Sequence, residues 1–245
     1  MSLLQSYLLA LIQGITEFLP ISSSGHLNLF QFIFGLKPSL ALDVFFNTAT
    51  LFSVLFFFRK KITFFFSHLP QIFIASLPAA IVGFFLKDQF EIIFTRAYFL
   101  PFFFFINSLI LLSTKRASSQ QQEITLTQAL LIGLAQAVAI LPGISRSGTT
   151  ITTALALGLS AQTAFNFSFS LFIPVSLGAL LLSLKDGDFH SFFNFQYFFI
   201  FLFTFVVGLL ALNLLQKLLL RRKLWYFAVY TFLLGLGTLI FYTYF

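Results

Sequence analysis

The chain contains no cysteine in its 245 residues. This absence excludes disulfide bonds, thiolate nucleophiles and thiolate metal sites. Charged residues are also scarce: they make up 9% of the chain, whereas soluble domains average about 25%. The polar surface that a soluble domain needs is therefore missing, and the composition indicates a membrane protein.

What the chain has instead is apolar sequence, since 59% of its residues are hydrophobic and 40 of them are phenylalanine. A helix of about 20 apolar residues is long enough to cross a bilayer. We expect an all-α, polytopic membrane protein that forms a single domain over residues 1–245. Six full transmembrane helices are predicted, near residues 40–58, 64–86, 97–113, 161–184, 195–220 and 224–244.

An internal repeat divides the chain into two halves. Shifting the sequence by 123 residues aligns two polar loops, and places Gln13 on Gln136, Ser22 on Ser145, Ser24 on Ser147 and Gly25 on Gly148. The predicted halves are residues 1–113 and 124–245, joined by a polar linker at 114–123. The chain is therefore expected to be a duplicated membrane protein.

Each half begins with two short apolar segments, 2–18 with 23–36 and 126–140 with 147–158. A loop that contains proline, serine and glycine separates the members of each pair. Such interrupted pairs favour re-entrant helical hairpins over complete spans. At matching positions in two repeats they are the strongest sequence pointer to a binding site.

Basic residues sort to one face under this topology. The face with nine carries Arg59, Lys60, Lys61, Lys115, Arg116, Lys217, Arg221, Arg222 and Lys223, and the other carries Lys37, Lys87, Arg96 and Lys185. An excess of positive charge marks the cytoplasmic face. Both termini are therefore predicted outside, with the two halves inverted. The net charge of +7 is interpreted as a topology signal, and no nucleic-acid partner is expected.

Ionisable residues within the apolar body are few: Glu17, His26 and Arg146 in the two loops, and Asp43 at the end of a span. An ionisable group inside a membrane protein is by default a candidate for function. The alternative interpretation is a structural ion pair between Glu17 and Arg146 that holds the two hairpins together.

Both loops end in a serine-rich turn that begins a helix. A helix N-terminus presents unpaired backbone N–H groups and a partial positive charge, and therefore binds anions. Simple N-capping is the alternative, since serine is a favoured cap. The residues predicted to bind phosphate are Ser22, Ser24, Gly25, Ser145, Ser147 and Gly148.

The two loops differ in the chemistry that they carry. Glu17, Ser23 and His26 supply acid–base and nucleophile types in the first loop, and Arg146 supplies a planar cation in the second. Arginine can bind two phosphate oxygens at once. Together these four residues indicate phosphoryl transfer, and the attacking group is left open among Ser23, His26 and a metal-bound water.

Gln13 and Glu17 are four residues apart and so lie on one face of a helix. Oxygen ligands in this arrangement suit Mg²⁺ or Ca²⁺. Two ligands are too few to hold such an ion alone. Phosphate oxygens of the substrate would have to complete its coordination shell.

At these loops the sequence resembles the undecaprenyl-diphosphate phosphatase family, the bacterial bacitracin-resistance phosphatases. The first family motif has Glu or Gln, three residues and then Glu, which Gln13 and Glu17 match; FLPISSSGH continues it through His26. The second motif, Pro-Gly-x-Ser-Arg-Ser with a following threonine, is met at residues 142–147 and at Thr150, which joins the predicted substrate-binding set. The resemblance extends over the whole chain in span order and repeat layout.

The resemblance implies hydrolysis of a C55 polyprenyl diphosphate to its monophosphate, a divalent-cation requirement, and a place in the bacterial plasma membrane. The substrate would be a membrane lipid with an anionic head group. The sequence leaves a homodimer open. The rival function is a polyprenyl-phosphate transporter or flippase, because inverted repeats with interrupted helices are typical of secondary transporters.

Overall fold

The computed structural model describes residues 1–86, 89, 92–93, 97–116, 120–186, 192 and 194–244. Within these residues the only β-structure is one isolated bridge between Gln121 and Leu159, so the fold is all-helical. Lys87, Arg96 and residues 117–119 of the expected linker lie outside the described residues.

The elements of the first half are α1 (Leu3–Thr16), α2 (Ser23–Ile33), α3 (Leu40–Phe58), α4 (Ile62–Ser67), α5 (Leu69–Phe85), η1 (Ala97–Phe99) and α7 (Leu100–Ser113). Next comes η2 (Thr114–Arg116), at the start of the expected linker. The elements of the second half are α8 (Leu126–Val138), α9 (Arg146–Ala156), α10 (Ala161–Asp186), α11 (Phe195–Leu220) and α12 (Tyr226–Tyr244).

Four of these helices are long and apolar enough to cross a membrane. They are α3, α10, α11 and α12, with mean hydropathies of 1.8, 2.0, 2.6 and 1.5 in their most apolar windows. Shorter apolar helices accompany them: α1, α5, α7 and α8. Large apolar side chains such as Phe84, Phe198 and Leu210 are exposed on the helix surfaces, which suits contact with lipid. The chain is a multi-pass membrane protein.

One predicted helix is not continuous. The sequence predicted a single span at 64–86, whereas the structure has two helices there, α4 and α5. Pro70 lies in the first turn of α5. Proline has no N–H to donate, and its ring would clash with the carbonyl four residues earlier, at Phe66. The first helix therefore ends at Ser67, and His68 joins the two helices with φ −116° and ψ 20°.

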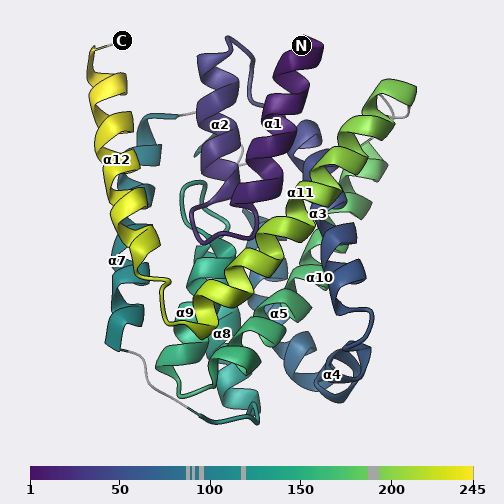
Figure 1. Cartoon of the computed structure of the whole chain (residues 1–245), viewed down its shortest axis with the longest axis vertical. Helices are drawn as coiled ribbons and strands as arrows, with labels where there is room; N and C mark the ends of the chain where they lie inside the picture. The colour runs from purple at the N-terminus through teal and green to yellow at the C-terminus, as the bar shows by residue number, and fades with distance from the viewer. Residues whose placement is uncertain are drawn as a thin grey trace.

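Two helical pairs meet in the middle of the molecule (Figure 1). The α1–α2 pair occupies the end at which both chain termini lie, and its connecting loop reaches the centre. The α8–α9 pair occupies the opposite end, and its loop reaches the same central region. The two polar loops that the repeat predicted are therefore brought together from opposite ends.

A phenylalanine cluster fixes the first loop. Phe18 is fully buried, and its ring centroid lies 5.7 Å from that of Phe169 and 6.3 Å from that of Phe172, both on α10. Because Phe18 directly follows Glu17, this packing holds the carboxylate in place against the second half of the chain.

Candidate active site

A cavity of about 250 Å³ lies where the two loops meet. Seven of the predicted site residues line it: Gln13, Glu17, Ser22, Ser23, Ser24, Ser145 and Arg146. Residues of α1, α2, α3, α5, α8, α9 and α10 contribute to its lining. Residues of both polar loops therefore line one cavity.

Ser22 and Ser145 cap the two helices that begin at this cavity. The Ser22 hydroxyl accepts the Gly25 N–H at 3.3 Å, and the Ser145 hydroxyl accepts the Gly148 N–H at 3.1 Å. These positions correspond in the repeat, so the capping is duplicated as well. N-capping is thus a real role of both serines, and it fixes each helix start with its free N–H groups beside the cavity.

Direct hydrogen bonds join the loops to each other. The Gly143 N–H donates to the Ser22 hydroxyl at 3.0 Å, and the Ser147 hydroxyl donates to the Phe18 carbonyl at 3.1 Å. Ser22 holds its position with φ +69°, a backbone conformation that costs free energy in any residue other than glycine. The bond from the opposite loop therefore supports a strained residue.

Asn107 of α7 ties both loops to the helix bundle, and sequence reasoning missed it. Its Nδ2 donates to the Pro20 carbonyl at 3.0 Å, and its Oδ1 accepts the Ser145 N–H at 2.9 Å. The side chain is fully buried. An amide side chain within a mostly apolar helix is the signal that could have found it.

Gly25 and Gly148, predicted to bind phosphate, lie behind the cavity wall and allow close packing. A Cβ on Gly25 would lie 2.8 Å from Phe104 Cζ and 3.0 Å from Gly143 Cα. A Cβ on Gly148 would lie 3.0 Å from Pro20 Cβ. Both glycines therefore let the two loops approach each other.

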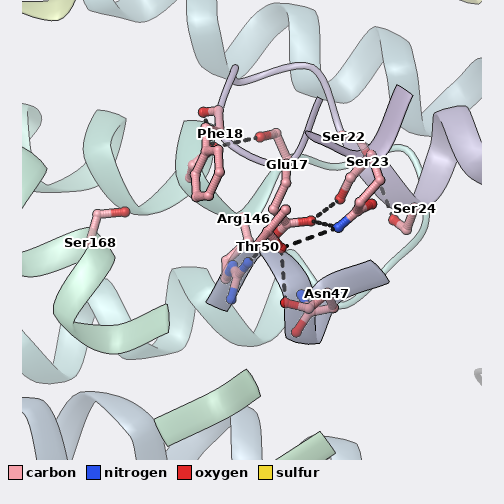
Figure 2. A network of polar contacts seen from close by, with 12 residues as sticks. Glu17, Phe18, Ser22, Ser23, Ser24, Asn47, Thr50, Arg146 and Ser168 are labelled. Carbon is pink, nitrogen blue, oxygen red and sulfur yellow. Dashed lines mark hydrogen bonds and ion pairs between the residues drawn. The ribbon is translucent and has the colours of Figure 1, made fainter. Parts of the chain in front are cut away.

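Glu17 is the centre of the polar network (Figure 2). Its Oε1 forms an ion pair with Arg146, and its Oε2 accepts the Ser23 hydroxyl at 2.5 Å and the Gln13 amide at 3.0 Å. The Glu17 side chain is only 5% exposed. The ion pair between Glu17 and Arg146, which the sequence offered as an alternative interpretation, is present and joins the two loops. The same carboxylate also accepts a hydrogen bond from a serine hydroxyl at the cavity.

Arg146 is held on two sides. Its guanidinium carbon lies 4.0 Å from the centroid of the Phe172 ring, in addition to the ion pair with Glu17. An arginine over an aromatic face gains cation–π stabilisation. The side chain remains 19% exposed, so a permanent cation is presented at the cavity surface.

His26, predicted as a catalytic residue, is buried and does not line the cavity. Its Nδ1 donates to the Ser22 carbonyl at 2.7 Å, and its Nε2 lies 2.8 Å from the Tyr230 hydroxyl. A carbonyl can only accept, so Nδ1 carries the proton and the tyrosine hydroxyl donates to Nε2. Both ring nitrogens are therefore engaged in holding the first loop.

Ser147 and Thr150 likewise lie behind the wall rather than on it. The Thr150 hydroxyl donates to the Arg146 carbonyl at 2.8 Å and lies 2.6 Å from the Ser168 hydroxyl. Thr150 thus connects the first turn of α9 to α10. Its contact with substrate stays a prediction.

Three polar residues that were not predicted as site residues also line the cavity: Asn47, Gln136 and Ser176. Asp43, which the sequence offered only as an ionisable candidate at the end of a span, lines it as well. Among the described residues, four cavity-lining side chains each have a buried oxygen without a hydrogen-bond partner: Gln13, Asp43, Gln136 and Ser176. The match of Gln136 to Gln13 in the repeat was a signal. Ser176 lies on α10, and the sequence contained no signal that it would line the cavity.

This arrangement has the parts of a phosphoryl-transfer site. A carboxylate bonded to a hydroxyl can take its proton and so activate it as a nucleophile. A guanidinium beside them binds phosphate oxygens and the charge that develops on them. The unpartnered carboxamide and carboxylate oxygens are the donor type that Mg²⁺ and Ca²⁺ prefer.

Comparison with known proteins agrees with a phosphoryl-transfer site. The family described as bacitracin resistance protein BacA matches residues 6–237. An undecaprenyl-diphosphatase of Thermosipho africanus is 37% identical over 241 residues, which cover 93% of this chain and 96% of that protein. Those of Methanobrevibacter smithii and Methanococcus vannielii are 36% and 35% identical, over 96% and 95% of this chain and 96% and 98% of their own lengths. The family resemblance of the two loops is confirmed, and this chain belongs to the BacA family of bacitracin resistance proteins.

Proposed function

We propose that this chain is a membrane phosphatase that hydrolyses undecaprenyl diphosphate to undecaprenyl phosphate and inorganic phosphate. The observation that carries the proposal is the Glu17 carboxylate, which binds the Ser23 hydroxyl and the Arg146 guanidinium at one cavity wall. The relatives named as undecaprenyl-diphosphatases support the substrate. The reaction recycles the lipid carrier of cell-wall synthesis.

In the proposed mechanism the diphosphate binds to Arg146 and to the helix starts at Ser22–Ser24 and Ser145. The Ser23 oxygen attacks the terminal phosphorus while its proton passes to Glu17. The bond from that phosphorus to the bridging oxygen breaks, and undecaprenyl phosphate leaves. Water then releases phosphate from Ser23. His26 does not line the cavity, and both of its ring nitrogens have hydrogen-bond partners, which favours Ser23 over His26 as the nucleophile.

A divalent cation is proposed as cofactor, near Gln13 and Glu17. Gln13 lines the cavity, and its buried Oε1 has no hydrogen-bond partner among the described residues; a carboxamide oxygen of this kind suits a hard cation. No group of three or more His, Cys, Asp or Glu comes together in the described part of the chain, so substrate oxygens would have to share the ion. Such a cation neutralises charge on the diphosphate.

Purified protein is expected to release phosphate from a polyprenyl diphosphate and to lose that activity in EDTA, with Mg²⁺ or Ca²⁺ restoring it. Phosphate release is measured by a colorimetric assay on detergent-solubilised protein. Absence of phosphate release would leave only the transporter interpretation. Full activity in excess chelator, with no metal detected in the protein, would remove the cation from the proposal.

We further propose six membrane crossings and two re-entrant hairpins, α1–α2 and α8–α9, in inverted halves at about 1–113 and 124–245. The loops of the two hairpins meet from opposite ends of the molecule (Figure 1), as inversion requires. The cavity lining includes Asp43, in the first turn of α3, on the side of the termini. We therefore propose that the site opens to the outer face of the plasma membrane.

Single cysteines test this topology, because the chain has none of its own. Cysteines at Lys60, Lys115 and Arg222 are expected to react only with reagents applied from the cytoplasm, because positive charge is retained there. Cysteines at Lys37 and Lys185 are expected to react from outside. Labelling of the Lys60 and Lys37 positions from the same side would overturn the inverted arrangement.

A further inference from the structure

The Glu17 carboxylate has little capacity left for a metal ion. It accepts hydrogen bonds from Ser23 and Gln13 and is paired with Arg146. The ion pair neutralises its charge. Gln13, the other residue near the proposed ion, is a neutral amide. A divalent cation placed between these two side chains would therefore meet almost no net negative charge.

Asp43 is the second carboxylate that lines the cavity. Its Oδ1 accepts the Gln31 amide at 2.9 Å, and Gln31 Oε1 in turn accepts the Ser39 N–H at 2.9 Å. Its Oδ2 is buried and has no hydrogen-bond partner among the described residues. The carboxyl group is thus held by one oxygen and leaves the other available for a ligand.

The same face of α3 is turned towards Gln13. Asp43, Asn47 and Thr50 follow one another at helical spacing, so their side chains lie on one face. Asn47 lines the cavity beside Asp43, and the Gln13 amide nitrogen lies 3.5 Å from the Thr50 hydroxyl. Figure 2 shows Asn47, Thr50 and Glu17 grouped in this region. The α3 face that carries Asp43 therefore borders the α1 residues of the site.

Gln13 is a second residue with a buried oxygen that is available to a ligand. Its residue exposure is 1%, yet its Oε1 has no partner among the described residues. A buried polar atom without a partner costs free energy. Two residues that line one cavity, Gln13 and Asp43, thus each have a buried oxygen without a partner among the described residues.

We propose that Asp43 is a ligand of the divalent cation and that its Oδ2, with Gln13 Oε1, binds the ion. This inference rests on the proposed function, since diphosphate oxygens complete the shell. Magnesium sites commonly use one or two carboxylates together with substrate phosphates. Asp43 then supplies the charge that the neutral Gln13 does not, and Glu17 is kept for Ser23 and Arg146.

The test measures Mn²⁺ bound to the full-length protein in detergent, by loss of the electron paramagnetic resonance signal of free Mn²⁺. Methylenediphosphonate, which resists hydrolysis, stands in for the diphosphate head group. Asp43→Asn keeps the size of the side chain and its bond to Gln31. It is expected to weaken Mn²⁺ binding by about tenfold or more, since even residues behind a metal's ligands account for such losses.

Glu123→Gln is the matched control, because Glu123 is an exposed carboxylate that does not line the cavity. It should bind Mn²⁺ as the unaltered chain does. In the Gln13→Glu/Asp43→Asn double variant, the carboxylate returns on the other side of the site, and Mn²⁺ binding is expected to recover. That recovery distinguishes a ligand from a residue that merely supports the fold.

Unchanged Mn²⁺ affinity in Asp43→Asn, or no recovery in the double variant, would overturn the assignment. Phosphate release from a polyprenyl diphosphate is measured on the same preparations. Release without any effect of Asp43→Asn on Mn²⁺ would leave the phosphatase function standing and remove only this inference. Metal binding that depends on Asp43, without phosphate release, would support the ion site and refute the function.

Discussion

Arg146→Ala is expected to lower kcat for phosphate release by about three orders of magnitude or more, as loss of a charge clamp on a transferring phosphoryl group does. Arg146 provides the one permanent cation among the residues that line the cavity within the described chain. No other lining group can replace its charge as negative charge develops on the departing oxygens. Steady-state kinetics on the purified proteins give the ratio of kcat between the unaltered chain and Arg146→Ala.

Arg146→Lys should recover only part of this loss, because lysine keeps the charge but not the planar fork that binds two oxygens. Arg59→Ala is the control, since Arg59 is exposed at the end of α3. Removing Arg146 also leaves the buried Glu17 carboxylate unpaired, which destabilises the protein, so thermal unfolding is recorded in parallel. Near-normal turnover in folded Arg146→Ala would place the phosphate site elsewhere.

Ser23→Ala and Glu17→Gln are each expected to lower kcat by about 10³-fold or more, and the double variant should be no worse than the poorer single one. Groups that act as one unit show such non-additive losses. The structural basis is the 2.5 Å hydrogen bond from the Ser23 hydroxyl to Glu17 Oε2. Single-turnover kinetics of the three variants provide the comparison.

His26→Ala, in contrast, is expected to lower kcat independently of Ser23→Ala. His26 holds the loop through the Ser22 carbonyl and Tyr230. In the double variant, the fold-decrease in kcat should therefore be the product of the decreases in His26→Ala and Ser23→Ala. Rapid quenching with labelled substrate should trap phosphate on Ser23. Trapped phosphate on His26, or fully multiplying losses for Ser23 and Glu17, would reject the serine mechanism.

Much of the helical framework could be predicted from the sequence. The helices found at Leu40–Phe58 and Phe195–Leu220 match their predicted bounds, because long apolar runs end at charged or polar residues. The paired short helices were found because proline, serine and glycine interrupt apolar segments at repeated positions. The helix break at His68 was missed, although Pro70 is a signal for the end of a helix. The apolar run around these two residues is otherwise unbroken.

The chemistry of the loops could be predicted, but not which side chains reach the cavity. Glu17, Ser23 and Arg146 were found as rare polar groups in apolar sequence, and all three line it. His26 is equally polar, yet the packing of α12 gives it Tyr230 as a partner. Ser176 lines the cavity only because α10 crosses it. Such placements depend on tertiary packing between segments far apart in the chain, which a local pattern does not encode.

The pairing of Glu17 with Arg146 has a consequence for product release in the proposed reaction. Inorganic phosphate and the carboxylate are both anions that fit the guanidinium. Glu17 already pairs with Arg146, so in the proposed reaction it would be the counter-ion of the guanidinium once phosphate has left. In the proposed reaction the Glu17 carboxylate would therefore compete with the released phosphate for Arg146, and this competition would limit product inhibition.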